Sequence, residues 1–420
     1  MKSSPNTSTP SEEVSLFARQ PIFDVNLNIK AYELLFRPPE YNEEKPLEEG
    51  SFDGDMATSQ VMFSAFTDVD IVEISENNPV FVNFTARWLT EAPPIDPKHL
   101  VIEILETITI TDEVIENIKK LSKLGYTIAL DDFEYSDEWK PILELADYVK
   151  LDVLKLNSKA LKQTIQKISP YNVKLLAEKI EDYEKLKECI NLGFEYFQGY
   201  FLCKPQNITG KKIPATRLAV MQIISELQSP STSIQKLEDL ISKDPTLSYK
   251  LLRIINSAAY STIKKIDSLH HAITLLGLTQ VKSWITLISL TNLSDKPEAL
   301  LTTALIRAKM CETLSQEGDL KDHEKYFTIG LFSVLDAFFD QEMKDILKNL
   351  PLSDEVKNAL LHHQGVEGKI LSTVEAFEQA RWQNIDWDFL EELGIDESKL
   401  KTGLMKSIHW SHEISSQISH

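Results

Sequence analysis

The chain has 420 residues, of which 42% are hydrophobic and 26% are charged, the composition of an ordinary soluble globular protein. This length favours two or three domains over a single core. The formal net charge of −20 argues against general nucleic-acid binding, which depends on neutralising phosphates. An anionic ligand would therefore need bound cations or a local basic patch.

The cysteines and the start of the chain indicate the compartment. Cys189, Cys203 and Cys311 lack the spacing of a zinc site, which predicts small buried thiols in a reducing environment. Residues 1–14 are rich in Ser, Thr and Pro and predict a disordered tail without a signal-peptide core. No long apolar run predicts a membrane span. We therefore expect a cytoplasmic protein that does not bind membranes.

Short apolar stretches alternate with amphipathic helical stretches over residues 15–205. Those with the Val, Ile, Leu and Tyr content of buried strands are FVNF (81–84), HLVIEILE (99–106), YTIALDD (126–132), YVKLDV (148–153), VKLLAEKI (173–180) and FEYFQGYFL (194–202). Roughly one helix of sequence separates neighbours, which is typical of βαβ units in a parallel sheet. The pattern predicts an α/β fold, a TIM-like (β/α) barrel, over residues 15–205.

The pattern changes after the stretch 203–215, which contains Pro and Gly. The rest of the chain shows helical periodicity with almost no strand signal. Asp244–Pro245 interrupts one helical stretch, because proline lacks an amide hydrogen and clashes with the preceding turn. We expect a second, all-α domain over residues 206–420.

Polar side chains recur at the carboxyl ends of consecutive predicted strands, where a parallel barrel has its active site. They are Asn83, Glu103 with Glu106, Asp131 with Asp132, Lys150 with Asp152, Glu178 with Glu181, and Gln198; the earlier segment AYELLFRP adds Glu33 and Arg37. A solvated strand-end charge explains any one of them alone. Their repetition on five consecutive strands favours a shared site.

The chemistry of this set favours divalent cations. Hard oxygen ligands suited to Mg²⁺ or Mn²⁺ come from Glu33, Asn83, Glu103 and Asp131. Asp132 and Glu178 are placed to hold a second ion, and Lys150 to orient or activate a water between the two. Such a pair of cations clamps both oxygens of an in-line phosphodiester displacement, and it explains how an acidic mouth binds an anion.

The motifs together resemble the EAL domain, whose members hydrolyse cyclic di-GMP to linear pGpG with two divalent cations. Seven motifs occur in the family's order: YELLFR (32–37), FVNFT, IEILE, LDDF, VKLD, AEKIE and FQGYFLCKP. The first has Leu34 where the family usually has alanine. The resemblance implies that the metal ligands are Glu33, Asn83, Glu103, Asp131, Asp132 and Glu178.

The resemblance also implies roles for residues around the metals. Lys150 has a catalytic role in positioning the attacking water, and Glu106 steadies the loop after the aspartates. The substrate contacts are assigned to Arg37, Gln198 and Glu181.

Two departures from the EAL pattern bear on activity. Active members usually continue the aspartate pair as DDFGTGYSS, whereas this chain reads DDFEYSDEWKP, with Glu134 at the first glycine position. Glycine permits backbone conformations that Glu and Tyr avoid, so we expect a different loop. Lys179 stands where the family has glycine, beside Glu178, and is expected to draw that carboxylate away from a cation.

The helical half resembles the HDOD domain, an all-α relative of HD-type phosphohydrolases. The resemblance lies in 240–261 and 266–290, at Asn256, Ser257, Ile266, Ala272, Leu276 and Gly277. HDOD domains lack the metal-binding His-Asp pair and act in signalling or scaffolding. Consistent with this, GLFSVLD (330–336) has Ser333 and Val334 where an HD enzyme has His and Asp.

Two pairs of adjacent histidines lie in the helical half, His270–His271 and His362–His363. Adjacent helical residues point about 100° apart and rarely share one ion, so we expect packed or exposed histidines. The joined EAL and HDOD architecture is similar to the YuxH-like group of bacterial signalling proteins.

Three functional hypotheses follow. The favoured one is a cyclic di-GMP signalling protein whose EAL-like domain binds or weakly hydrolyses the nucleotide, coupled to a non-catalytic HDOD domain that binds protein partners. Its extreme form is a pure protein-interaction scaffold. The second is a fully active Mg²⁺- or Mn²⁺-dependent phosphodiesterase that produces pGpG. The third is a barrel metallohydrolase for another phosphodiester. The sequence leaves a homodimer open.

Overall fold

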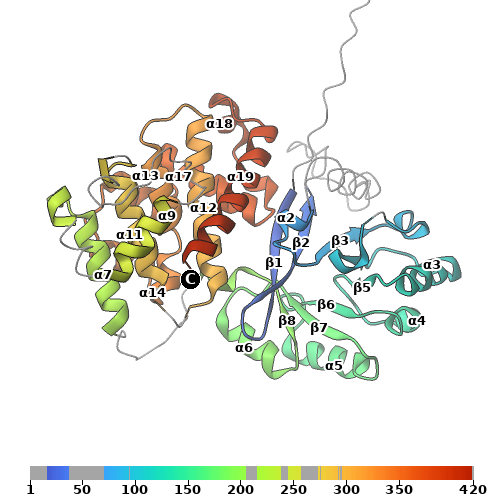
Figure 1. Ribbon diagram of the computed structural model, residues 1–420. Helices are drawn as coiled ribbons and strands as arrows, with labels where there is room; N and C mark the ends of the chain where they lie inside the picture. Colours follow the sequence, from blue (N-terminus) through green and yellow to red (C-terminus); the bar gives the residue numbers. More distant parts are fainter. Residues whose placement is uncertain are drawn as a thin grey trace, which may run out of the picture.

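The computed structural model describes residues 17–36, 71–93, 95–204, 215–237, 245–256, 273–274, 276–291, 293 and 296–418. In this part of the chain a closed eight-stranded barrel is followed by a unit made only of helices (Figure 1). We refer to residues 17–204 as the barrel unit and to residues 215–418 as the helical unit. No helix in the described ranges is long and apolar enough to cross a membrane.

The strands follow one another around the barrel in sequence order. They are β1 (Phe17–Asp24), β2 (Ile29–Phe36), β3 (Val80–Phe84), β4 (Leu100–Ile104), β5 (Thr127–Leu130), β6 (Tyr148–Asp152), β7 (Lys174–Glu178) and β8 (Tyr196–Phe197). Neighbours from β2 to β8 are parallel, which confirms the TIM-like barrel.

Two details differ from the predicted parallel sheet. Strand β1 runs antiparallel to both β2 and β8, so the sheet is mixed. A tight turn makes this possible: the Asp24 carboxylate accepts hydrogen bonds from the amides of Asn26 and Asn28, and no crossover helix is needed. The strand predicted over 194–202 is also shorter. It ends at Phe197, and a 3₁₀ helix, η4 (Tyr200–Cys203), follows.

Helices cover the outside of the barrel. They are α2 (Ile71–Ile74), α3 (Asp112–Lys123), α4 (Lys140–Leu143), α5 (Ser158–Ile168) and α6 (Tyr183–Asn191). Capping side chains set two of the starts, because Thr111 Oγ1 accepts from the Val114 amide and Asp182 accepts from the Lys185 amide. Buried residues such as Ile118 on α3 fill the layer between helices and strands.

The barrel interior is built in two layers with different chemistry. The lower layer is apolar and contains Ile22, Ala31, Phe81, Val101, Ala129 and Leu176, with Tyr148 and Tyr196 packed against it. Alternate residues of a strand share one face, so the next interior residue lies two positions further along each parallel strand. Those positions are Glu33, Asn83, Glu103, Asp131, Lys150, Glu178 and Gln198, and on the antiparallel β1 the equivalent is Gln20. Strand geometry thus gathers one polar side chain from each strand or, for Asp131 and Gln198, from the residue just after it.

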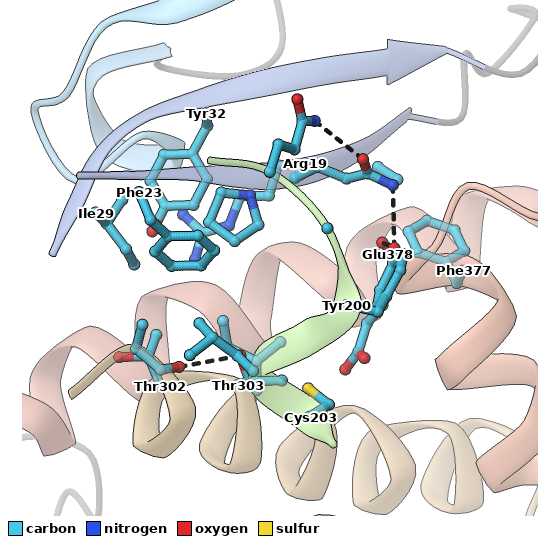
Figure 2. Close-up of a pocket in the computed structure, with 18 of the residues that line it drawn as sticks. Arg19, Phe23, Ile29, Tyr32, Tyr200, Cys203, Thr302, Thr303, Phe377 and Glu378 are labelled. Atoms are coloured by element: carbon cyan, nitrogen blue, oxygen red, sulfur yellow. Dashed lines mark hydrogen bonds between the residues drawn. The ribbon is translucent and has the colours of Figure 1, made fainter. Parts of the chain in front are cut away.

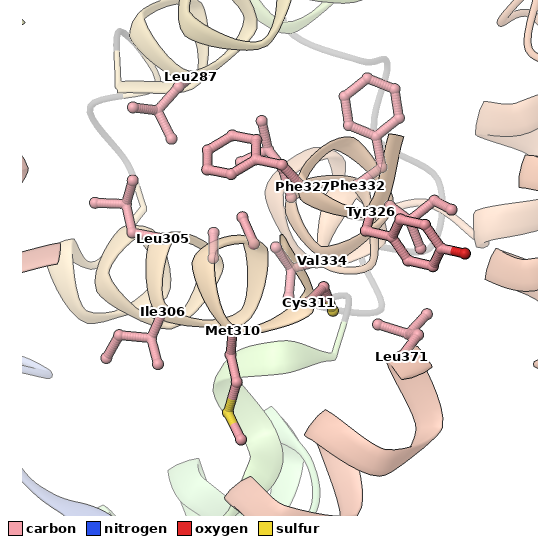
Figure 3. Close-up of a cluster of buried hydrophobic side chains, with 14 of the residues drawn as sticks. Leu287, Leu305, Ile306, Met310, Cys311, Tyr326, Phe327, Phe332, Val334 and Leu371 are labelled. Atoms are coloured by element: carbon pink, nitrogen blue, oxygen red, sulfur yellow. The ribbon is translucent and has the colours of Figure 1, made fainter. Parts of the chain in front are cut away.

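The helical unit has one large core. Its helices are α7 (Ala215–Gln228), α9 (Pro245–Ile255), α11 (Leu278–Thr291), α12 (Glu298–Glu317), α13 (His323–Phe332), α14 (Leu335–Phe339), α15 (Met343–Lys348), α16 (Asp354–His362), α17 (Gly365–Glu378), α18 (Trp387–Glu392) and α19 (Glu397–Ile418). Trp284, Phe327 and Trp410 form mutual ring contacts at 5.6 to 6.1 Å within it. Figure 3 shows Met310 and Cys311 of α12 in the same core, with Cys311 near Val334 and Met310 pointing away from the labelled aromatic side chains of α13. Helix α9 is described from Pro245 onward, and the predicted break before this proline lies outside the described residues.

The two units touch along β1 and η4. Strand β1 lies against α17, and η4 lies against α12 and α14. Ala18 of β1 belongs to the hydrophobic core of the helical unit. A mainly apolar pocket lies at this contact between the units. It is lined by Tyr32 and Tyr200 from the barrel and by Thr303 and Phe377 from the helices (Figure 2).

Candidate functional site

Lys150 lies at the centre of the polar layer of the barrel and is fully buried. Its Nζ atom is 2.5 Å from Glu103, 2.7 Å from Asp131, 2.9 Å from Glu178 and 3.3 Å from Glu33. One ammonium thus faces four carboxylates. The cluster keeps an excess of negative charge in a poorly hydrated place, which is costly without a further cation.

The ionisation of the cluster reflects this charge imbalance. Burial raises the pKa of Glu178 to about 8, and the negative charges of Asp131 and Glu33 act in the same direction. Burial also raises the pKa of Glu103 well above its usual range. The surrounding carboxylates outweigh the burial of Lys150 and raise its pKa, so this side chain remains an ammonium. The cluster holds protons near neutral pH that a divalent cation would displace.

Asp132 belongs to a separate group of charges. Its Oδ2 atom is 2.8 Å from Lys155 Nζ and 3.7 Å from Lys179 Nζ. Lys179 also contacts Asp152 at 2.6 Å, and this contact, with backbone hydrogen bonds, lowers the pKa of Asp152. The two neighbouring aspartates therefore point into different clusters, Asp131 toward Lys150 and Asp132 toward the exposed lysines.

The remaining residues that the sequence singled out lie at varying distances from the cluster. Gln198 Nε2 donates to Glu33 Oε2 at 2.7 Å, and Asn83 lies opposite Glu103 in the strand register. Glu106 lies on the turn after β4, where partial desolvation of its carboxyl, together with the two aspartates, raises its pKa. Glu181 is exposed beyond β7. Arg37 lies outside the described residues.

The segment after the aspartates has its own fixed structure. The Phe133 amide donates to the Lys150 carbonyl at 3.0 Å, and the Phe133 ring packs edge-on against Trp139. Glu134 is exposed at the position of the family's first glycine. Lys179, the second departure from the family, has a φ of +58°, a left-handed conformation that glycine adopts without strain.

The donor set fits a hard divalent cation. Carboxylate oxygens of Glu33, Glu103 and Asp131 lie within 4.8 Å of one another. Glu103 Oε2 is buried and has no hydrogen-bond partner within the described ranges. A buried acceptor without a partner is unfavourable, and a cation bound to these oxygens would satisfy it. Carboxylate oxygens suit Mg²⁺ or Mn²⁺ better than softer metals.

The sequence did not single out Gln20 and Lys155. Gln20 Oε1 accepts from Gln198 at 3.0 Å, next to the carboxylate cluster. The signal lies in ARQPIF, where Gln20 alternates with Ile22, but only an antiparallel β1 brings it to the polar layer. Lys155 lies three residues after the end of β6. A basic side chain close to acidic strand ends is a pattern that could have indicated it.

The helical unit carries an ion cluster where an HD enzyme would carry its metal ligands. Ser333 Oγ accepts a hydrogen bond from Arg307 at 2.9 Å, and Val334 is buried. His363 Nε2 lies 2.9 Å from Glu375, which raises the pKa of the histidine. His362 is exposed, and His270 and His271 lie outside the described residues.

Comparisons with solved structures return EAL proteins. One is the cAMP-bound form of the EAL enzyme Bd1971, 20% identical, with a TM-score of 0.36 over 44% of this chain and 61% of the other. Another is the FimX EAL domain of Pseudomonas aeruginosa bound to c-di-GMP. It is 18% identical, with a TM-score of 0.36 over 45% of this chain and 89% of the other.

Sequence comparisons cover almost the whole chain. The EAL domain model matches residues 55–205 and the HDOD domain model matches residues 213–365. Protein YuxH of Bacillus subtilis is 34% identical over 94% of this chain and 98% of its own length. Cyclic di-GMP phosphodiesterase CdgJ of Vibrio cholerae is 33% identical over 94% of this chain and 92% of its own. The chain therefore belongs to the family of two-domain proteins that join an EAL domain to an HDOD domain.

Proposed function

We propose that the chain binds cyclic di-GMP at the mouth of the barrel through divalent cations and hydrolyses it to pGpG. The observation that carries this proposal is the group formed around Lys150 by the buried Glu33 and Glu103 and the partly buried Asp131. The relative named as a cyclic di-GMP phosphodiesterase, which matches this chain over 94% of its length, supports the choice of substrate.

The chain's own residues then have distinct tasks. Mg²⁺ or Mn²⁺ bound here would polarise a phosphoryl oxygen and lower the pKa of a bound water. Glu33, Glu103 and Asp131 would hold the cation, and Gln198 keeps Glu33 in place through its 2.7 Å hydrogen bond. Lys150 is an ammonium, so it donates hydrogen bonds to water or to a phosphate oxygen and cannot accept a proton. The water oxygen forms a bond to phosphorus as the bond from phosphorus to the ribose 3′ oxygen breaks. The water gives up one proton and the leaving oxygen takes one up, so the opened product carries a 5′-phosphate and a 3′-hydroxyl.

A second candidate is nucleotide binding without turnover. The contacts of Asp132 favour this candidate. Its carboxylate is paired with Lys155 and Lys179, and these ammonium groups occupy the oxygens that a second cation would need. Two-metal catalysis stabilises both the attacking and the leaving oxygen, so a site with one cation would turn over slowly. In both cases we propose that the HDOD half is non-catalytic and signals through protein partners, because Val334 offers no ligand atom.

The test is turnover of cyclic di-GMP by the purified full chain with Mg²⁺ or Mn²⁺, followed by separation of pGpG on a column. We expect Glu33→Ala and Asp131→Asn each to lower the rate at least about 100-fold, since each removes a metal ligand. Glu195→Gln is the matched control, because this exposed carboxylate lies at the start of β8, opposite the mouth. It should leave the rate within about twofold.

Three outcomes separate the candidates. Turnover that disappears in both ligand variants supports hydrolysis. Heat of cyclic di-GMP binding without any pGpG supports the second candidate. If the wild-type chain shows neither product nor binding heat at millimolar nucleotide, both candidates are wrong.

A further inference from the structure

A relay of hydrogen bonds leads from Glu33 in the barrel to the last residue of α17. Figure 2 labels the two final members of this relay, Tyr200 and Glu378. Gln198 Nε2 donates to Glu33 Oε2 at 2.7 Å and to Gln20 Oε1 at 3.0 Å. Gln20 Nε2 donates to the Tyr200 hydroxyl at 3.0 Å, and this hydroxyl donates to the carbonyl oxygen of Glu378 at 2.8 Å. The relay thus connects a candidate metal ligand with the helical unit.

Each hydrogen bond of the relay can run in one direction only. The Glu33 carboxylate accepts, so Gln198 must turn its NH₂ group toward it. Gln20 then accepts through its oxygen and donates through its nitrogen. The Tyr200 oxygen already accepts from Gln20, so its proton goes to Glu378. A rearrangement at either end must therefore alter both amides in between.

The helical end of the relay is firmly held. Glu378 is the last residue of α17, so its carbonyl lacks a partner inside the helix, and Tyr200 supplies one. Arg307 of α12 binds the Glu378 carboxylate through Nη2 at 2.7 Å and binds Glu375 through Nη1 at 3.0 Å. Arg307 also contacts Cys203 Sγ at 3.9 Å, so both ends of η4 touch the helical unit.

The barrel end of the relay is equally constrained. Burial raises the pKa of Tyr200 far above its usual value, so the hydroxyl keeps the proton that it donates. Gln20 and Glu33 lie directly opposite each other in the pairing of β1 with β2. Gln198 is only 4% exposed, and its Oε1 atom has no hydrogen-bond partner among the residues described, which leaves one buried acceptor beside the carboxylate cluster.

We propose that Tyr200 is a positioning residue through which the helical unit sets the orientation of Glu33, and with it the affinity of the barrel mouth for divalent cations. This inference rests on the proposed function, in which Glu33 is a metal ligand. Residues that orient metal ligands typically change metal affinity 10- to 100-fold when they are replaced. Coupling between two sites is reciprocal, so cation binding must also alter the α17 end of the relay.

The experiment compares the full chain with Tyr200→Phe, which removes only the hydroxyl. We expect the variant to bind Mn²⁺ about tenfold more weakly in a calorimetric titration without nucleotide. Amide exchange followed by mass spectrometry should show that Mn²⁺ slows exchange at residues 375–381 in the wild type but not in Tyr200→Phe. Tyr126→Phe is the matched control, because its hydroxyl binds the Pro93 carbonyl at 2.6 Å, away from the relay.

A double-mutant cycle with Gln20→Met tests whether the two residues act in series. We expect Gln20→Met with Tyr200→Phe to weaken Mn²⁺ binding no more than Gln20→Met alone. Wild-type affinity in Tyr200→Phe, or additive losses in the double variant, would overturn this inference and leave the proposed function intact. If the wild-type chain takes up no Mn²⁺, both the proposed function and this inference are wrong.

Discussion

Lys150 is a residue whose replacement affects stability and ligand binding together. Its ammonium is the partner of four carboxylates, of which Glu33, Glu103 and Glu178 are buried. We expect Lys150→Gln to lower the free energy of unfolding by about 3 to 5 kcal/mol without metal, because removing one partner leaves buried like charges uncompensated. Urea denaturation measures this loss, and Lys162→Gln, which changes an exposed lysine on α5, is the control.

Added Mn²⁺ should restore part of the stability of Lys150→Gln, because a ligand that binds only the folded state stabilises it. The midpoint in urea should rise at least as far as it does for the wild type, since no ammonium then competes for the carboxylate oxygens. An unchanged midpoint at saturating Mn²⁺ would contradict the metal assignment.

The carboxyl group of Asp336, at the start of α14, should make the stability of the helical unit depend on pH. Burial raises its pKa to about 6, although Arg307 acts in the opposite direction. The folded chain therefore binds a proton between about pH 4 and pH 6 that the unfolded chain lacks. The stability from this group is present below about pH 4 and is lost as the pH rises through about 6.

We expect the wild type to lose about 2 kcal/mol more than Asp336→Asn between pH 4 and pH 7.5. Chemical denaturation over that range measures the difference. Glu391→Gln, at an exposed carboxylate of α18, should follow the wild-type curve. Parallel curves for the wild type and Asp336→Asn would show that Asp336 has an ordinary pKa.

At the scale of elements, the join between β8 and η4 depends on one glycine. Gly199 has a φ of +149°, and a Cβ atom there would lie 2.1 Å from the Ile180 carbonyl oxygen. We expect Gly199→Ala to cost about 3 kcal/mol of unfolding free energy, because the backbone must move. Gly193→Ala has a positive φ but open space, so strain alone should cost about 1 kcal/mol. Equal losses in urea denaturation would contradict the close-approach argument.

Much of the barrel follows from strand periodicity. The sequence predicts strand-end positions for Glu33, Asn83, Glu103, Asp131 and Glu178. Each of them lies two residues after an apolar interior residue of its strand, and this spacing brings them to one layer. Their roles as ligands remain predictions.

Other features depend on long-range geometry that no local pattern contains. The antiparallel direction of β1 is set by the turn after Asp24, and only this direction places Gln20 beside Gln198. Asp131 pairs with Lys150 and Asp132 with Lys155, and both lysines lie far along the chain from the aspartates. Contacts between side chains that are far apart in the sequence are therefore the part of the site that could not be predicted from the sequence.

At the scale of the whole molecule, Arg307 joins the two units. It is buried, binds Glu375 and Glu378 and contacts Cys203 of the barrel. We expect Arg307→Gln to lower the unfolding free energy by about 3 kcal/mol and to speed labelling of Cys203 by a thiol reagent at least tenfold. In the wild type burial raises the pKa of Cys203 to about 11, so the reactive thiolate is scarce.

Cys189, which is buried under the barrel helices, is the internal control for that labelling experiment. Mass spectrometry distinguishes the thiols. If Cys203 and Cys189 are labelled at the same rate in Arg307→Gln, the variant exposes them only through global unfolding, and Arg307 does not hold the units together.

The short segment from Gln198 to Cys203 belongs to both halves of the molecule. Its first residue supports a carboxylate inside the barrel, and its tyrosine and cysteine meet a helix end and a guanidinium outside it. The two halves are therefore poor candidates for exchange. A hybrid with its barrel from one relative and its helices from another would combine surfaces that were never selected together, even if each half kept its own fold.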